Sequence, residues 1–343
     1  MKSINQRKRE HLDLVLNEQG VDREKRYFDA IRLTHRALPE VDFSAIDPSV
    51  TFLGKELSFP LIISSMTGGS DAELRRINQN LAAAAEAEGI GFALGSQRVG
   101  LLDQTANASF NVRDVAPTAL LMSNLGAVQL NEGVEIAQIK EMLLRVNADA
   151  LFLHLNPLQE MIQPRGDRNF SNLAEKIARV VSELSVPVII KEVGAGISPQ
   201  DIERLLDAGV HYIDLAGTGG TSWSQIEGCR CEDASMGSLF ADWGIPTPQA
   251  LRLAQPYLDR ATFIASGGLR SGVDMVKSLV LGASVCGMAR PFLAPATDSV
   301  EAVRAVIQRL RAECVATLFL LGATCVKDVQ GKNGLILNED WYR

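Results

Sequence analysis

The sequence has few cysteines and few aromatic residues, with no excess of positive charge and no long hydrophobic run. Its five cysteines are odd in number and show no zinc-ligand spacing. We therefore expect free thiols in a reducing, cytoplasmic environment, which excludes disulfide-stabilised secreted domains and zinc modules. The cysteines are Cys229, Cys231, Cys286, Cys314 and Cys325.

Charge and hydropathy exclude two further classes of protein. The formal net charge is −7, whereas a general nucleic-acid-binding protein carries a basic surface excess. No apolar run approaches the roughly 18 residues of a membrane span, and residues 1–16 are too polar for a secretory signal peptide. We therefore expect neither nucleic acid nor a membrane as a partner, and an anionic ligand needs a locally positive site.

What the sequence does contain is a series of short apolar runs that end in small or polar residues. Runs that are almost continuously apolar are typical of parallel strands buried on both faces. Amphipathic segments lie between most of them, and start residues such as Ser171 and Ser198 predict helices there. The eight expected strands lie within residues 60–69, 90–97, 118–126, 149–157, 187–194, 212–220, 262–268 and 284–291.

Eight strands that alternate with helices predict an α/β protein, a (β/α)8 TIM barrel, and favour it over a doubly wound sheet. We expect a single domain over residues 1–343, in which 1–58 form an N-terminal extension, 59–330 the barrel and 331–343 a surface tail. After the sixth strand the chain carries a long insertion, residues 222–248. Loops of that length are usually functional or mobile.

Polar residues follow the expected strands at their carboxyl ends, where barrel enzymes have their active sites. HLNPLQE, residues 154–160, is open to two interpretations. It is either a capped strand end before a helix that begins at Pro157, or part of a substrate site. Lys191 ends the fifth run, where its ammonium group has three open roles: a solvated surface group, the partner of an anion, or a Schiff-base amine.

Glycines and arginines follow the last two strands. Gly267 and Gly268 end the seventh run, with Arg270 nearby, and Arg290 ends the eighth. This corner commonly binds phosphate in such barrels, because glycines let backbone N–H groups approach an anion, although glycine pairs are also common in tight turns. TGGTSW at 218–223 is open to the same two interpretations.

A basic run, RKREHL at 7–12, lies outside the expected strands. Such a run near a terminus is often simply solvated. Arg7, Lys8 and His11 lie within one helical turn, however, and that spacing also suits the capture of a diphosphate.

Together these motifs resemble one family, the type 2, FMN-dependent isopentenyl-diphosphate delta-isomerases. The resemblance covers nearly the whole chain, from RKREHL through SSMTGG, GSQR, HLNPLQE, KEVGAGIS, AGTGGTSW and SGGLRSG to GMARP. It implies a (β/α)8 barrel that binds FMN and requires Mg²⁺. The FMN is active in its reduced form, and NADPH is the implied reductant. The implied reaction interconverts isopentenyl and dimethylallyl diphosphate in isoprenoid biosynthesis, in a homo-oligomer that is a tetramer or an octamer.

The resemblance also implies site residues by position. It places His154, Gln159, Glu160 and Lys191 in catalysis, with the reduced flavin as acid and base, Lys191 near the flavin N1 and C2 oxygen, and Glu160 as the Mg²⁺ ligand. The implied FMN contacts are Ser65, Met66, Thr67, Gly68, Ser96, Asn124, Lys191, Thr221, Gly268, Leu269, Arg270, Ala289 and Arg290. The implied substrate contacts are Arg7, Lys8, His11, Ser96, Gln97, Arg98, His154, Asn156 and Gln159.

One position departs from the family pattern. The family commonly has a serine five residues before the threonine at 221, where this chain has Ala216. We expect one hydrogen bond to the flavin phosphate to be missing, a loss of about 1 kcal/mol in FMN binding.

Two other classes remain open alternatives. The first is an FMN-dependent barrel oxidoreductase that acts on a small organic acid such as a 2-hydroxy acid. That chemistry needs a His–Arg pairing on late strands, and the seventh strand ends in glycines without a histidine. The second is a non-catalytic scaffold that binds flavin or diphosphate, which the many polar residues at the strand ends disfavour.

Overall fold

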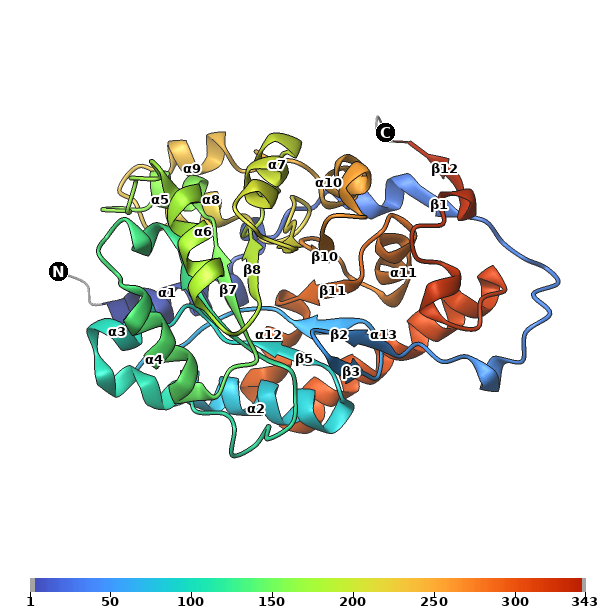
Figure 1. Ribbon diagram of the computed structural model, residues 1–343, viewed down its shortest axis with the longest axis horizontal. Coiled ribbons are helices and arrows are strands. Elements are labelled where there is room, and N and C mark those ends of the chain that lie inside the picture. Colours follow the sequence, from blue (N-terminus) through green and yellow to red (C-terminus); the bar gives the residue numbers. More distant parts are fainter. Residues whose placement is uncertain (1–3, 341–343) are drawn as a thin grey trace.

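A closed barrel of eight parallel strands forms the centre of the molecule in the computed structural model, which describes residues 4–340 (Figure 1). Each strand lies inside one of the runs expected from the sequence, and each pairs with the next along the chain. The last strand pairs back with the first, Cys286 opposite Leu61, so the barrel is confirmed and the open doubly wound sheet is excluded. The strands are β4 (Leu61–Ile63), β5 (Gly91–Ala93), β6 (Leu121–Gly126), β7 (Ala150–His154), β8 (Val188–Lys191), β9 (Tyr212–Asp214), β10 (Thr262–Ser266) and β11 (Val285–Met288).

Side chains that point inward fill the barrel with a packed core. Ile62, Phe152 and Ile264 belong to one buried cluster inside it. The hairpin of β2 (Val50–Phe52) and β3 (Lys55–Leu57) adds Phe52 and Leu57 to the same cluster. Because this cluster also contains the first residues of β7 and β11, the hairpin closes the amino-terminal end of the barrel and leaves the carboxyl end for the site.

Amphipathic helices surround the barrel and bury their apolar faces on it. The side chain of Ser198 caps the helix α7 by accepting a hydrogen bond from the backbone N–H of Asp201, as the sequence predicts. The helix α6 begins after Asn172, one residue beyond the expected Ser171. The surrounding helices are α2 (Ala72–Glu88), α4 (Ile136–Val146), α6 (Leu173–Glu183), α7 (Pro199–Asp207), α10 (Thr247–Ala254), α11 (Gly272–Val280), α12 (Arg290–Asp298) and α13 (Val300–Leu321).

The remaining helices lie at the mouth of the barrel and in the connections. The insertion after β9 folds into two of them, and the first is mostly buried and packs against α5. These helices are α1 (Ile4–Asn17), α3 (Arg98–Leu102), α5 (Pro157–Ile162), α8 (Trp223–Gly228) and α9 (Ser235–Leu239). The 3-10 turns are Gln19–Val21, Tyr27–Ala30, Phe43–Ala45, Gln104–Ser109, Ala127–Leu130, Gln255–Tyr257, Val326–Asp328 and Asn333–Leu335.

A strand of the N-terminal extension and the C-terminal end of the described chain meet in a small antiparallel sheet. The strand β1 (Ile31–Leu33) pairs with β12 (Ile336–Glu339), with Ile31 opposite Glu339. The segment expected as a surface tail is therefore partly a strand that ties the N-terminal extension to the C-terminal end. Within residues 4–340, no helix combines the length and the apolar character needed to cross a membrane.

Candidate active site

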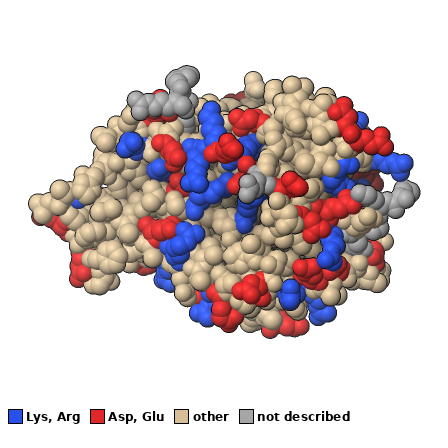
Figure 2. Space-filling model, turned by 180° about the vertical axis from the view of Figure 1, so that it is seen from behind, with Lys and Arg blue, Asp and Glu red and all other residues tan. Residues whose placement is uncertain are grey.

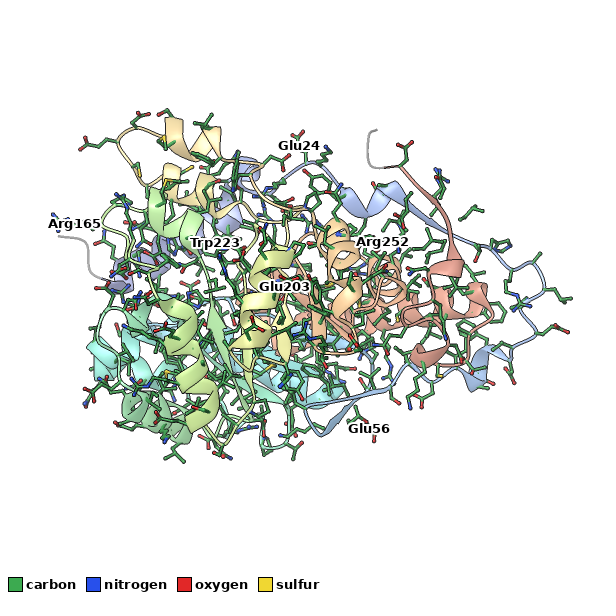
Figure 3. All side chains as sticks on the ribbon, turned by 45° about the horizontal axis from the view of Figure 1, so that its top comes forward. Glu24, Glu56, Arg165, Glu203, Trp223 and Arg252 are labelled. Carbon is green, nitrogen blue, oxygen red and sulfur yellow. The ribbon has the colours of Figure 1, made fainter. Side chains whose placement is uncertain are left out.

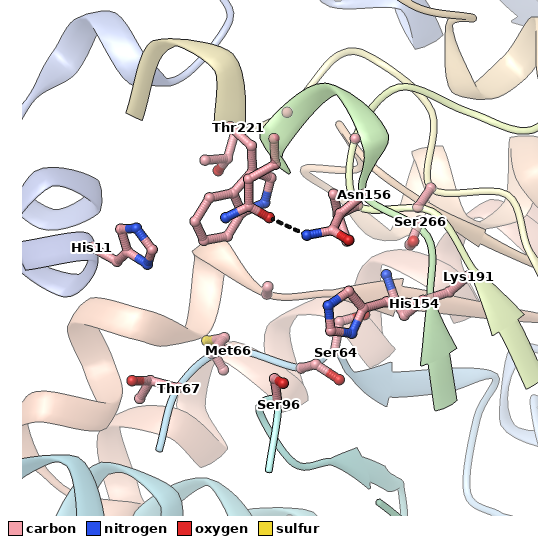
Figure 4. A pocket seen from close by; sticks show the side chains of 18 of the residues that line it. His11, Ser64, Met66, Thr67, Ser96, His154, Asn156, Lys191, Thr221 and Ser266 are labelled. Atoms are coloured by element: carbon pink, nitrogen blue, oxygen red, sulfur yellow. Dashed lines mark hydrogen bonds between the residues drawn. The ribbon is translucent and has the colours of Figure 1, made fainter. Parts of the chain in front are cut away.

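A cavity of about 240 Å³ lies at the carboxyl ends of the barrel strands (Figure 4). All eight strand ends contribute to its lining, because parallel strands in a closed barrel direct the residues that follow them to one mouth. Side chains of α1, including His11, approach from the opposite side of the cavity (Figure 4). The N-terminal extension is thus part of this site.

Most of the residues implied by the sequence lie together in the lining of this cavity. They come from the extension, from the loops after every strand and from the first turn of α12. They are Arg7, Lys8, His11, Ser65, Met66, Thr67, Ser96, Arg98, Asn124, His154, Asn156, Gln159, Glu160, Lys191, Thr221, Gly268, Leu269, Arg270, Ala289 and Arg290.

Two of the implied residues, Gln97 and Gly68, are absent from the described lining. The amide oxygen of Gln97 accepts hydrogen bonds from the Ser123 hydroxyl and from the Asn124 backbone N–H. Gln97 therefore helps to hold Asn124, which lines the cavity, in place. A Cβ atom at Gly68 would lie 2.1 Å from the ring of Phe110. Glycine is therefore required for the close packing of this loop.

The lining of the cavity has more cations than carboxylates, in a protein of net charge −7. Among the described lining residues, Glu160 is the only carboxylate. Figure 2 shows Lys and Arg side chains gathered near the centre of one face of the molecule. The locally positive site that an anionic ligand requires is therefore present, and its cations are Arg7, Lys8, Arg98, Lys191, Arg270 and Arg290.

Three of these cations, Arg7, Lys8 and Arg98, crowd one another. Burial, followed by the charge of Arg7 and more weakly that of Arg98, lowers the pKa of Lys8 to about 8 against the opposing effect of Glu227. The Nε atom of Arg7 is buried and has no hydrogen-bond partner within residues 4–340. Cations whose charges act on one another, with an unused buried donor among them, match a polyanionic ligand.

A second cationic corner lies after β10 and β11. The backbone of Gly268 has φ +81°, and a Cβ atom there would lie 2.6 Å from the carbonyl carbon of Gly219. The loops after β9 and β10 therefore touch backbone to backbone. The Nη1 atom of Arg290, at the start of α12, is buried without a hydrogen-bond partner in the described part of the chain. Free donors at a helix start fit a phosphate group.

Lys191 and His154 lie side by side at the floor of the cavity (Figure 4). Lys191 Nζ donates to the backbone oxygen of Glu192 at 2.6 Å and lies 3.6 Å from Asp214 Oδ2. His154 Nδ1 is 2.8 Å from Asn124 Oδ1. Burial, followed by the charges of Lys191 and Lys8, lowers the pKa of His154 to about 3, so His154 is neutral beside a cation.

HLNPLQE combines both of its interpretations. Helix α5 begins at Pro157, as a capped strand end requires, and Asn156, Gln159 and Glu160 also line the cavity. Asn156 Nδ2 donates to Glu160 Oε1 at 2.9 Å and to Gln159 Oε1 at 3.2 Å. Burial, with the nearby charge of Asp167, raises the pKa of Glu160 against the opposing effect of its hydrogen bonds and of Arg7.

The candidate that sequence reasoning missed is Glu227, on α8 of the insertion. Its side chain is fully buried, accepts a hydrogen bond from Gln159 Nε2 at 2.9 Å and lies 3.0 Å from His11 Nε2. Arg230, three residues later, forms an ion pair with it. Burial raises the pKa of Glu227, but the contacts with His11, Gln159 and Arg230 outweigh burial and lower it to about 2. The i, i+3 spacing of Glu227 and Arg230 in a loop already marked as functional was the available clue.

Comparison with known proteins agrees with these observations. The model of the FMN-dependent dehydrogenase family matches residues 13–123 and 123–335. An isopentenyl-diphosphate delta-isomerase from Hydrogenovibrio crunogenus is 51% identical over 337 residues, covering 97% of this chain and 98% of the relative. The chain belongs to the isopentenyl-diphosphate delta-isomerase family. An isopentenyl-diphosphate delta-isomerase from Paracoccus zeaxanthinifaciens is 50% identical and covers 96% of each chain.

Solved structures with the same barrel include flavoprotein oxidoreductases. A flavocytochrome b2 variant with sulfite bound has a TM-score of 0.68 at 18% identity and covers 97% of this chain and 83% of its own. Mandelate oxidase with (S)-2-phenylpropionate has a TM-score of 0.61 at 17% identity and covers 93% and 92%. Likeness at this identity shows the fold alone. The oxidoreductase alternative is the less supported one, since the two histidines that line the cavity, His11 and His154, lie on α1 and β7 and not on late strands.

Proposed function

We propose that this protein interconverts isopentenyl diphosphate and dimethylallyl diphosphate, with reduced FMN bound in the barrel mouth. The observation that carries the proposal is the division of the cavity's cations into two groups. The charges of Arg7 and Arg98 lower the pKa of Lys8, and the charge of Arg98 also lowers that of Arg7, whereas Arg270 and Arg290 share a carboxylate of the extension. One cavity thus offers one anion site for a diphosphate and a second for a flavin phosphate, with Lys191 as a further cation in the same lining.

The residues at the second corner fit FMN. Arg290 and Thr67 both line the cavity. Their Nη1 and Oγ1 atoms are buried and have no hydrogen-bond partner within residues 4–340. We assign Arg270, Arg290 and the loop at Gly268 to the phosphate, and Thr67 and Lys191 to the flavin. Reduced FMN supplies acid–base chemistry when bound, and Lys191 would stabilise negative charge next to it.

The side chains of this protein hold the substrate. An alkene is a poor base, so catalysis needs a dry pocket and firm anchoring of the diphosphate away from the reacting carbons. We assign that anchoring to Arg7, Lys8, His11 and Arg98. Glu227 fixes the amide of Gln159 by accepting its N–H, which leaves Gln159 held in one orientation in the cavity lining.

We further propose that Glu160 binds Mg²⁺. Glu160 and Asn156 both line the cavity and offer oxygen atoms as metal ligands. The Oδ1 atom of Asn156 is buried and has no hydrogen-bond partner among the described residues. Among the described residues no group of three or more His, Cys, Asp or Glu side chains is arranged to hold a metal ion. One carboxylate with substrate phosphates and waters is a coordination set typical of Mg²⁺.

Three further properties complete the proposal. NADPH reduces the flavin, the protein forms a homo-oligomer, tetrameric or octameric, and it works in the cytoplasm. All five cysteines are unpaired in the structure, which supports a reducing compartment.

An anaerobic assay tests this function. Purified protein is incubated with FMN, Mg²⁺, NADPH and isopentenyl diphosphate, with matched samples that lack flavin or reductant, and dimethylallyl diphosphate is measured. Product that forms only with reduced flavin is the expected result. No product in any sample, from protein that has bound FMN, would contradict the proposed reaction and leave a different flavin reaction in this barrel.

A further inference from the structure

One carboxylate of the N-terminal extension joins the two arginines of the phosphate corner. Asp22 Oδ1 accepts a hydrogen bond from Arg270 Nη2 at 2.7 Å, and Asp22 Oδ2 lies 3.5 Å from Arg290 Nε. Each arginine therefore uses one edge of its guanidinium group for Asp22. Because a guanidinium carries five N–H donors, each keeps further donors for an anion, including the unpartnered buried Nη1 of Arg290.

The backbone places Asp22 there. Asp22 forms an isolated antiparallel bridge with Thr221, in the glycine-rich loop after β9. On either side of it, the Ser222 N–H donates to Val21 O at 2.7 Å and the Arg23 N–H donates to Gly220 O at 3.1 Å. Residues 21–23 are thus paired with the loop whose Gly220 and Thr221 line the cavity.

The same extension carries the diphosphate residues. Helix α1, with Arg7, Lys8 and His11, ends only a few residues before Asp22, and a 3-10 turn connects them. Residues 21–23 therefore hold α1 over the mouth from its C-terminal side, in addition to the ion pairs of α1 itself, in which Arg9 pairs with Asp71 and Glu73 and Glu10 pairs with Arg230. A phosphate that draws Arg270 and Arg290 into one fixed arrangement also fixes their shared partner.

We propose that Asp22 is a positioning residue that couples the FMN phosphate site to the substrate site. It orients Arg270 and Arg290 so that their free N–H groups face the phosphate. FMN binding in turn anchors the extension and completes the diphosphate site of α1. The inference depends on the proposed function, since it assigns FMN to this corner.

The test compares Asp22→Asn with Glu24→Gln in the full-length chain. Both variants lose one negative charge from the same segment, and Glu24 is an exposed residue at the periphery of the molecule (Figure 3). Dissociation constants of FMN and of riboflavin, which lacks the phosphate, are measured by quenching of flavin fluorescence. Asp22→Asn should weaken FMN binding about tenfold, the size expected when a hydrogen bond to a charged group is lost. It should leave riboflavin binding unchanged, and Glu24→Gln should change neither.

Trypsin cleavage after the exposed residues Lys25 and Arg26 reports on the extension. In the wild type, FMN should slow this cleavage more than riboflavin does. In Asp22→Asn the two flavins should protect equally, and the KM for isopentenyl diphosphate of the FMN-saturated variant should rise more than kcat falls. Asp22→Glu, which keeps the carboxylate, should recover part of the FMN affinity.

Three results would overturn the inference. They are tighter FMN binding by Asp22→Asn, equal weakening of FMN and riboflavin, and behaviour of Asp22→Asn identical to that of Glu24→Gln. Failure of the isomerase proposal looks different, because the FMN-loaded wild type would then produce no dimethylallyl diphosphate at all.

Discussion

The ion cluster around Glu227 gives the sharpest prediction, for the nearly isosteric change Glu227→Gln. The substitution removes the charge that faces His11 and Arg230 but keeps the volume of the side chain. The new amide nitrogen also has to lie next to the cationic Arg230 or the N–H of Gln159. We therefore expect lower stability together with a weaker substrate site, because His11 and Gln159 lose their fixed partner.

The size of the stability loss follows from the pKa of Glu227, which falls from 4.5 to about 2 in the folded protein. At 1.36 kcal/mol per unit, the folded surroundings favour the charged form by about 3 kcal/mol. Removal of one partner from a buried ion pair typically costs a similar 3–5 kcal/mol. Because the folded pKa is depressed, this contribution is complete above pH of about 4.5 and is lost as the pH falls towards about 2.

Urea unfolding of the wild type, Glu227→Gln and Glu232→Gln at a fixed FMN concentration measures the difference. Glu232 is an exposed carboxylate of the same insertion and serves as the control. The free energy of unfolding of Glu227→Gln should be lower by about 3 kcal/mol at pH 7 and pH 5, with a smaller difference at pH 3.5. A loss no larger than that of Glu232→Gln, or a difference that grows as the pH falls, would refute the reasoning.

Three further predictions concern the cofactor, the metal and the departure from the family pattern. Lys191→Ala should lower flavin-dependent kcat about 100-fold or more while changing isopentenyl diphosphate affinity little, because charge stabilisation acts in the reaction itself. Lys140 is exposed, so Lys140→Ala serves as the control and should leave turnover unchanged. Unchanged turnover in Lys191→Ala would remove Lys191 from catalysis. Glu160→Gln should shift the Mg²⁺ titration of activity to higher concentration, and an identical titration would count against ligation. Ala216→Ser, in the cavity lining, should tighten FMN binding about fivefold, the equivalent of about 1 kcal/mol, and no change in the FMN dissociation constant would show that no phosphate hydrogen bond is missing there.

The sequence by itself determined the barrel. Each strand of three to six residues lies in a local, mostly apolar run, and several of the helices between them, such as α2, α7 and α11, begin at a capping side chain. These signals are local, so they can be recognised without any long-range contact. It also determined most of the lining of the site, because residues that directly follow parallel strands must meet at one end of a closed barrel. His154, Lys191, Gly268 and Arg290 were found in this way.

Only the tertiary structure decided how the segments outside the strands complete the site. Glu227 meets Gln159, which is 68 positions away, and Asp22 meets Arg270, which is 248 positions away. Neither contact leaves a periodic pattern in the sequence, since a carboxylate outside the strands looks the same in a sequence whether it is solvated or buried. What separates the two cases is the set of cations and amides that the fold brings around it, because a buried carboxylate persists only where such partners offset its desolvation.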